Sequence, residues 1–267
     1  MQVNGCELYV QDTGRGVPIV FSHGLLWSAR MYNAQIAALA DRYRCVAYDH
    51  RGQGRSESPR GDILDGHGIS IEQVYLDAVS LIESLKLGPC HFVGLSMGGF
   101  VGQRIAARRP DLLRSLVLLE TAADPEPQSN VPKYRTLNKI ARLGGLSFVA
   151  GQVMPIMFGD SFLKDPKRKK QRAECERQLK NNGRSIYKAV NGVIEREDFE
   201  PELRKIEVPT LIVHGEEDRA IVRERAERLH AGIRGSEFVL LPKGGHSSTI
   251  EEPELVNAEI QRFLASR

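Results

Sequence analysis

Short runs of apolar residues alternate along the chain with longer segments whose apolar residues recur at helical spacing. The short runs are continuous and rich in β-branched residues, which is typical of strands buried on both faces of a sheet. They cover residues 17–24, 43–52, 90–96, 114–120, 209–215 and 236–242. The segments with helical spacing cover residues 31–42, 70–87, 98–110, 223–233 and 253–266. This order predicts an α/β fold with a mostly parallel, doubly wound sheet and helices on both sides.

Two regions depart from this alternation. Residues 6–14 (CELYVQDTG) predict an additional strand or hairpin at an antiparallel edge of the sheet. Between about Asp124 and Pro201, proline, glycine and long helix-prone stretches replace the buried-strand pattern. Unstructured loops of this length are uncommon in compact domains, so the region predicts an inserted helical cap. We therefore expect a core of residues 1–123 and 201–267, with the cap in residues 124–200.

Composition narrows the class of protein. With 267 residues the chain is long enough for one large domain that carries an insertion, and a net charge of +3 does not indicate a nucleic-acid partner. The four cysteines form no CxxC pair, so they indicate neither a disulfide framework nor a zinc site. The first residues lack a signal-peptide pattern, and no run approaches the roughly 20 apolar residues of a membrane helix. We expect a cytoplasmic protein without a membrane span.

The segment Gly94–Gly99 (GLSMGG) carries the strongest indication of chemistry. It places Ser96 in a Gly-x-Ser-x-Gly pattern between a predicted strand and a predicted helix, which is the context this pattern requires. A serine hydroxyl is a weak nucleophile unless a sharp turn presents it beside a base, and Gly94 and Gly98 permit such a turn. We predict that Ser96 is a nucleophile. The alternative is a glycine-rich turn with an incidental serine.

A nucleophilic serine needs a proton acceptor. His246 follows the last predicted strand and precedes the terminal helix, on a loop at the carboxyl end of a strand, where the sites of such sheets collect. We predict His246 as the general base, and its alternative role is a hydrogen bond to the backbone. The other histidines lie at strand ends, on a helix or in other loops and are weaker candidates: His23, His50, His67, His91, His214 and His230.

The base in turn needs a carboxylate that fixes its tautomer and stabilises its charged form. Asp218 follows the penultimate predicted strand, three residues after Gly215, and we predict that it has this role. Glu217 and Glu120 are the main alternatives, and Glu216 is also chemically able. The acidic loop at 216–218 could equally be a solvated surface.

Negative charge that develops on an attacked carbonyl oxygen needs N–H donors. The N–H of Met97, directly after Ser96, is one expected donor. The second donor is expected in the loop His23-Gly24-Leu25-Leu26. We predict the N–H of Leu25 for this role, and the N–H of Leu26 is the alternative. The alternative is an ordinary turn with buried leucines.

Five motifs together resemble the α/β-hydrolase superfamily, in its serine-nucleophile branch of carboxylesterases, haloperoxidase-like esterases and enol-lactonases. They are FSHGLL at 21–26, DHRGQGRS at 49–56, GLSMGG at 94–99, HGEED at 214–218 and GGHSS at 244–248, in family-like order and spacing. The resemblance extends over essentially the whole chain apart from the cap. It implies the α/β-hydrolase fold, the chain order serine, acid, histidine, and a bracing role for Asp49 and Arg51.

The resemblance also separates this chain from relatives with an aspartate nucleophile, because Ser96 implies acyl transfer through an ester intermediate. One departure concerns the acid. Many relatives carry a proline shortly after it, whereas this chain has Arg219-Ala220-Ile221-Val222.

Apolar residues of the cap and the first loop are candidates for a substrate pocket over Ser96. The pocket candidates are Leu26, Trp27, Met154, Met157 and Phe158. The cap residues could equally form the cap's own core, and Trp27 could pack inward. The basic run from Lys164 to Arg172 predicts a solvated cap helix, with a membrane-surface or acidic-substrate role as the alternative.

We expect a serine hydrolase that cleaves small to medium carboxylic esters through an acyl-enzyme, without a metal or cofactor. A lactonase of the enol-lactone or acyl-homoserine-lactone type is the nearest alternative. C–C bond hydrolysis, perhydrolysis and a non-catalytic small-molecule receptor are further alternatives. The expected partner is a small ester or lactone, bound by a monomer or homodimer.

Overall fold

The computed structural model describes residues 1–57 and 68–267, and a seven-stranded sheet lies at its centre. The strand order is β3-β5-β4-β6-β7-β8-β9, in which only the β3–β5 pair is antiparallel. The strands are β3 (Val10–Thr13), β4 (Val17–Ser22), β5 (Tyr43–Tyr48), β6 (Cys90–Leu95), β7 (Leu113–Leu119), β8 (Thr210–Gly215) and β9 (Glu237–Leu241). The predicted α/β fold with a mostly parallel sheet is confirmed.

The antiparallel edge comes from the first residues of the chain, as the sequence predicts. Segment 6–14 contains the edge strand β3 and also β2 (Cys6–Glu7), which pairs with β1 (Gln2–Val3) in a separate two-stranded sheet.

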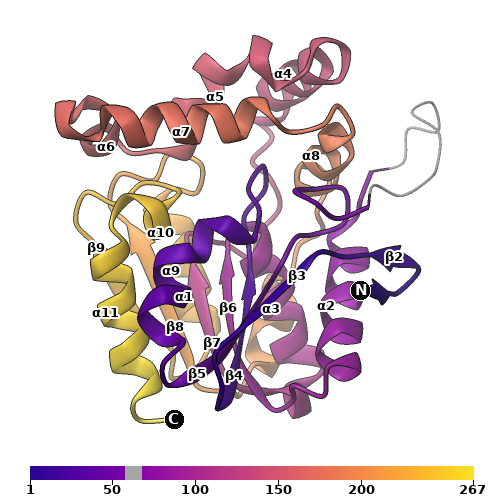
Figure 1. Ribbon diagram of the computed structural model, residues 1–267, viewed down its shortest axis with the longest axis vertical. Helices are drawn as coiled ribbons and strands as arrows, with labels where there is room; N and C mark the ends of the chain where they lie inside the picture. The colour runs from indigo at the N-terminus through magenta and orange to yellow at the C-terminus, as the bar shows by residue number, and fades with distance from the viewer. Residues whose placement is uncertain (58–67) are drawn as a thin grey trace.

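Helices cover both faces of the sheet (Figure 1). On one face α1 packs against α11, and on the other α2 packs against α3, while η5 contacts both α3 and α9. The helices are η1 (Ala29–Tyr32), α1 (Asn33–Leu39), α2 (Ile71–Ser84), α3 (Met97–Arg108), η2 (Pro110–Leu112), η5 (Glu200–Lys205), α9 (Arg223–Gly232), α10 (Ser248–Glu251) and α11 (Pro253–Leu264). Helix α2 begins with a capping box in which Ser70 and Gln73 each accept from the other's backbone N–H, which fixes its start.

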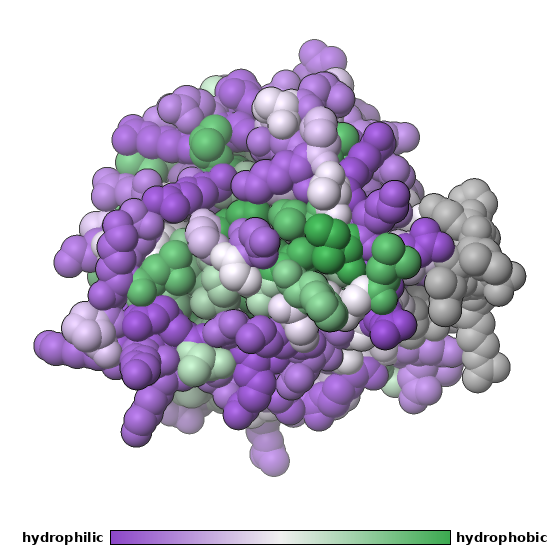
Figure 2. Space-filling view, turned by 90° about the horizontal axis from the view of Figure 1, so that it is seen from above, coloured by the Kyte–Doolittle hydropathy of each residue, from purple (hydrophilic) through white to green (hydrophobic). Residues whose placement is uncertain are grey.

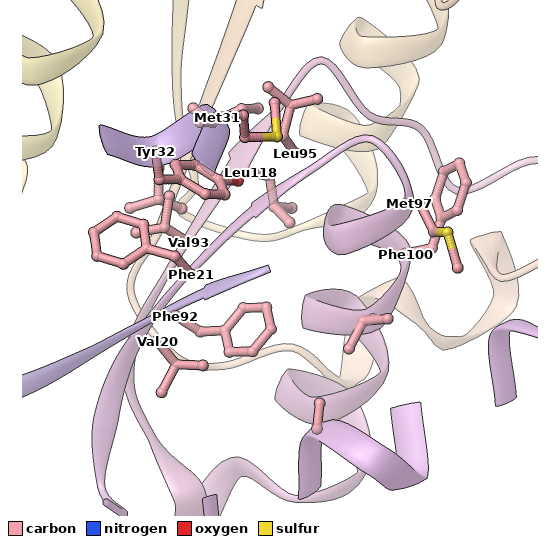
Figure 3. Packing of buried hydrophobic residues seen from close by; sticks show 14 of the residues in the cluster. Val20, Phe21, Met31, Tyr32, Phe92, Val93, Leu95, Met97, Phe100 and Leu118 are labelled. Atoms are coloured by element: carbon pink, nitrogen blue, oxygen red, sulfur yellow. The ribbon is translucent and has the colours of Figure 1, made fainter. Parts of the chain in front are cut away.

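Apolar side chains on both faces of the central strands form the core (Figure 3). In the β4–β6 register Val20 pairs with Phe92 and Phe21 pairs with Val93, so the members of each pair point to the same face. The ring of Phe21 lies 5.0 Å from that of Tyr32, measured between centroids. Each such fully buried ring stabilises the fold by roughly 1.5–3 kcal/mol, and this packing holds β6 rigid beneath the site.

A second group of helices lies together above the carboxyl ends of the strands (Figure 1). It comprises α4 (Val131–Gly144), η3 (Leu146–Phe148), α5 (Ala150–Met157), α6 (Asp160–Lys164), η4 (Pro166–Arg168), α7 (Lys169–Lys180) and α8 (Ile186–Ile194). We call residues 131–194 the cap helices. They fall within residues 124–200, and the division of the chain into core and inserted cap stays a prediction. Among the described residues, no helix combines the length and the apolar character that crossing a bilayer requires.

Candidate active site

Ser96 lies on a sharp turn between β6 and α3. Its φ and ψ are 50° and −110°, a strained conformation for a residue with a side chain. The turn depends on two glycines. A Cβ added at Gly94 would lie 2.3 Å from the carbonyl oxygen of Gly98, and one added at Gly98 would lie 1.9 Å from that of Ser22. Side chains at either position would therefore displace the turn that presents Ser96.

A chain of hydrogen bonds connects Ser96 to His246 and Asp218. The Oγ of Ser96 lies 3.0 Å from Nε2 of His246, and Nδ1 of the same ring lies 2.9 Å from Oδ2 of Asp218. All three residues are buried, and they come from the loops that follow β6, β9 and β8. The structure thus brings together the three residues that the sequence predicts as nucleophile, base and acid.

Backbone donors occupy the second oxygen of Asp218. Its Oδ1 accepts hydrogen bonds from the N–H groups of Ala220 and Ile221, at 2.8 and 3.0 Å. Such donors stabilise a buried carboxylate charge and fix its orientation. The segment after Asp218 therefore holds the carboxylate without the proline that many relatives carry there.

The two main alternative acids are placed less well than Asp218 for this role. Glu217 accepts hydrogen bonds from the backbone N–H and the hydroxyl of Ser161, so it connects the core to α6. Glu120 is fully buried, and burial raises the pKa of its carboxyl well above the ordinary value, with the negative charge of Asp218 raising it further. A raised pKa disfavours the charged carboxylate that an imidazolium needs as its partner.

The other described histidines have structural surroundings. Nε2 of His23 accepts from the N–H of His50, and burial lowers the pKa of His23 to about 4. His91 lies beside Ser115, and burial lowers its pKa also to about 4, while His230 contacts the hydroxyl of Ser236. His214 is buried, and burial lowers its pKa. His67 lies outside the described residues.

Two backbone N–H groups near Ser96 are available to a bound oxygen. Met97 is the first residue of α3, and the first N–H groups of a helix have no partner within it. In the other loop, the N–H of Leu26 donates to Oε1 of Gln53 at 3.0 Å, whereas no acceptor is recorded for that of Leu25 in the described part of the chain. This arrangement favours Leu25 over Leu26 as the second donor.

Gln53 connects the two loops that carry these donors. Its Oε1 accepts from Leu26, and its Nε2 lies 3.5 Å from Sδ of Met97. Gln53 lies in the motif at 49–56, whose resemblance implies a structural role, so the sequence did not mark it as part of the site. In that segment Asp49 accepts from the N–H of Ala29, and Arg51 pairs with Asp77.

An apolar cavity with a volume of about 120 Å³ opens beside Ser96 and His246. Most of its wall is apolar and comes from the cap helices, and the core contributes Phe100 and Ile221. Its aliphatic cap residues are Leu137, Ala141, Leu146, Val149, Val153, Ile156, Met157, Val190, Val193 and Ile194. No group of three histidine, cysteine, aspartate or glutamate residues in the described segments is placed to hold a metal ion.

Two of the five residues predicted for the pocket line this cavity, and three do not. Leu26 and Met157 are part of its wall, whereas Trp27, Met154 and Phe158 are not. The indole N–H of Trp27 donates to the hydroxyl of Ser247, and its ring packs edge-on against Phe158. The apolar spacing of α5 therefore serves cap packing as well as the cavity.

Glu251 is a second residue that the sequence analysis did not single out. One of its carboxylate oxygens accepts from the N–H of Ser247, directly after His246, and the other accepts from the N–H of Gly159 in the cap helices, at 2.9 and 2.8 Å. It lies five residues after His246, and this nearness along the chain was the only feature of the sequence that could have drawn attention to it. This residue connects the histidine loop to the cap.

We expect Glu251 to make the stability of the protein pH-dependent. Burial raises its pKa from 4.5 to about 7. Between these values the folded protein retains a proton that the unfolded chain has released, so the free energy of unfolding falls as pH rises. The loss is about 3 kcal/mol, from roughly 1.4 kcal/mol per pKa unit. Denaturant unfolding below and above this window should show the loss in the wild type but not in Glu251→Gln.

Glu254→Gln is the matched control, because Glu254 is exposed on the neighbouring helix. It should retain the wild-type pH dependence. An equal loss of stability in Glu251→Gln and the wild type would show that another group is responsible.

Comparison with known proteins agrees with this fold. A family model described as alpha/beta hydrolase fold matches residues 17–253. A protein named "Putative carbamate hydrolase RutD" from Rhizobium rhizogenes is 30% identical to this chain, over 98% of this chain and 97% of its own length.

Two solved structures are similar over nearly the whole chain. The enol-lactonase from Burkholderia xenovorans LB400 has a TM-score of 0.89 at 29% identity and covers 98% of both chains. A thermophilic esterase from Thermogutta terrifontis has a TM-score of 0.88 at 28% identity, over 98% of this chain and 94% of its own. With the family model matching most of its length, the chain belongs to the α/β-hydrolase family, as the resemblance of its five motifs implies.

Proposed function

We propose that the protein is a serine esterase that hydrolyses small to medium carboxylic esters with apolar groups. The observation that carries this proposal is the hydrogen-bonded chain from Ser96 through His246 to Asp218 beside an apolar cavity. The family supports a hydrolase in general, and the cavity supports the ester.

The geometry suits an acyl-enzyme mechanism. Oγ of Ser96 attacks the ester carbonyl while Nε2 of His246 takes its proton, and Asp218 stabilises the resulting imidazolium. The N–H groups of Met97 and Leu25 donate to the oxygen that becomes negative. His246 then protonates the leaving alcohol. Water hydrolyses the acyl-enzyme through the same groups.

The cavity favours an apolar acyl group of limited length. A cavity of roughly 150 Å³ can hold a molecule the size of benzene, and this one has about 120 Å³. A carbamate, the substrate class in the name of the RutD relative, would leave these apolar walls unfilled. Burial of each methylene contributes about 0.8 kcal/mol, so filling the cavity increases selectivity for substrates with apolar groups.

A lactonase is the second candidate. It is favoured by the close structural similarity to the enol-lactonase from Burkholderia xenovorans LB400. A lactone differs from an open ester only because the leaving alcohol stays attached to the acyl group, so the same residues would serve. The shape of the cavity decides between the two.

We expect a panel of 4-nitrophenyl esters, simple lactones and methyl carbamate to separate these functions. For esters, kcat/KM should rise roughly fourfold with each methylene from acetate upward until the chain outgrows the cavity. The acid that hydrolysis releases is measured by the colour change of a pH indicator. Ser96→Ala is the control for background hydrolysis. Faster turnover of lactones than of every ester would favour the lactonase, and turnover of the carbamate alone would contradict the esterase.

We further propose that the enzyme works in the cytoplasm. All four cysteines are buried free thiols, which suits a reducing compartment. Whether it acts as a monomer or a homodimer stays a prediction.

A further inference from the structure

The exposed end of α4 and the following η3 carry large apolar side chains on their outer surface. Ile140, Leu143 and Phe148 are 40%, 69% and 72% exposed. We call these three residues the apolar tip. Seen from above, hydrophobic side chains gather in the middle of the face formed by the cap helices, and hydrophilic side chains surround them (Figure 2). Exposed leucine and phenylalanine at this density indicate a surface that another apolar phase covers.

The cap helices around the tip are strongly basic. Residues 131–188 contain 14 lysines and arginines but only four aspartates and glutamates, whereas the whole chain has 37 and 34. The rest of the chain is therefore net negative. Lys133 and Lys139 of α4 are exposed, and neither forms an ion pair within residues 1–57 and 68–267. The excess of basic residues thus lies in the same group of helices as the apolar tip.

We propose that the cap helices dock on the surface of anionic lipid, with the apolar tip inserted among the acyl chains and the lysines against the headgroups. An amphipathic segment with basic residues beside leucine and phenylalanine binds in this way at the boundary between headgroups and acyl chains. Anionic lipids attract juxtaposed lysine and arginine side chains, which gives the docked molecule its orientation.

Two other occupants fit these residues less well. A second copy of the chain through the same face would place two strongly basic surfaces against each other. A protein partner normally buries about 800 Å² on each side, with an aromatic and aliphatic centre, whereas the apolar tip consists of three side chains ringed by charge. A lipid surface needs only a small insertion and a basic surround.

Docking in this orientation would bring part of the cavity wall to the lipid. The tip residues alternate along the chain with Leu137, Ala141, Leu146 and Val149, which line the cavity beside Ser96. The segment 137–149 therefore has one side in the cavity and the other at the proposed lipid surface.

Sedimentation with vesicles tests the proposal on the whole protein. The probes are vesicles of phosphatidylcholine alone and of phosphatidylcholine with phosphatidylglycerol, at low and high salt. We expect binding only to the anionic vesicles, weakened by salt. The double variants Leu143→Ser/Phe148→Ser and Lys133→Glu/Lys139→Glu should each reduce the association constant by about tenfold or more.

Matched controls lie away from the cap helices. Leu255→Ser changes an exposed leucine on α11, and Arg15→Glu/Arg234→Glu changes the net charge as much as the lysine variant, at exposed positions. Both should bind vesicles as the wild type does, and thermal unfolding checks that every variant is folded. Because the tip lies outside the proposed catalytic groups, hydrolysis of a soluble acetate ester reports separately on the proposed function.

Four results would overturn the proposal. They are no binding to anionic vesicles at low salt, binding that is unchanged in Leu143→Ser/Phe148→Ser, self-association that this variant abolishes, and binding to polyglutamate without binding to vesicles. Unchanged binding in Leu143→Ser/Phe148→Ser would mean that the protein adsorbs to lipid by charge alone. Self-association that this variant abolishes would show that the tip contacts a second copy of the chain. Binding to polyglutamate without binding to vesicles would indicate that the partner is an acidic protein.

Discussion

Replacing Ser96 with alanine should lower kcat by about 10⁶-fold, the order of loss seen when a serine nucleophile is removed. The variant lacks the hydroxyl that lies 3.0 Å from Nε2 of His246, so no acyl-enzyme can form. Its fold should persist, because alanine fits the space of serine and only one hydrogen bond, worth about 1 kcal/mol, is lost. The measurements are ester hydrolysis at saturating substrate and denaturant unfolding.

Ser115→Ala is the matched control for this prediction. Ser115 is also buried, on β7, and its hydroxyl contacts His91 at 2.7 Å, outside the cavity lining. Its kcat should stay near the wild-type value. If Ser96→Ala retained more than about one hundredth of wild-type kcat, the loss would be too small for a nucleophile, and the proposed mechanism would be wrong.

Asp218→Asn should lower kcat by about 10⁴-fold, because a neutral amide can neither stabilise the imidazolium nor hold the ring in the required tautomer. The amide occupies the same space, and its oxygen can still accept from the N–H groups of Ala220 and Ile221. The expected result is therefore a loss of rate with little change in KM. Steady-state kinetics over a range of ester concentrations measures both.

Two variants compare the alternative acids under the same conditions. Glu120→Gln replaces a buried carboxyl whose raised pKa disfavours the charged form that the role of the acid requires, and we expect nearly wild-type kcat. Glu217→Gln weakens the contact with Ser161 in the cap and should affect KM more than kcat. A large loss in Glu120→Gln, with an active Asp218→Asn, would move the acid to the end of β7.

The sequence predicts the sheet well because its central strands, β6, β7 and β8, are buried on both faces. Each continuous apolar run corresponds to one strand within a few residues, from β4 to β9. The turn at Ser96 is equally predictable, since Gly94 and Gly98 have no room for a side chain. In these places a local pattern and a local steric requirement coincide.

Residues whose contacts depend on distant segments were not predictable in the same way. Gln53 bonds to Leu26 and lies beside Met97, 27 and 44 positions away along the chain. Glu251 bonds to Gly159, 92 positions away. Apolar spacing within α5 likewise did not distinguish Met157, which lines the cavity, from Met154, which does not. Such roles depend on how the cap helices lie over the core.

The cavity wall and the proposed reacting groups come from different parts of the chain. Ser96, His246, Asp218 and both N–H donors lie outside residues 131–194, whereas more than half of the cavity-lining residues lie within them. Substitutions in α4, α5 and α8 can therefore change which substrates fit without altering the geometry of bond cleavage. Substrate specificity can therefore diversify, in evolution or in the laboratory, while the chemistry stays the same. A directed-evolution library confined to these helices should yield altered substrate ranges with little loss of turnover.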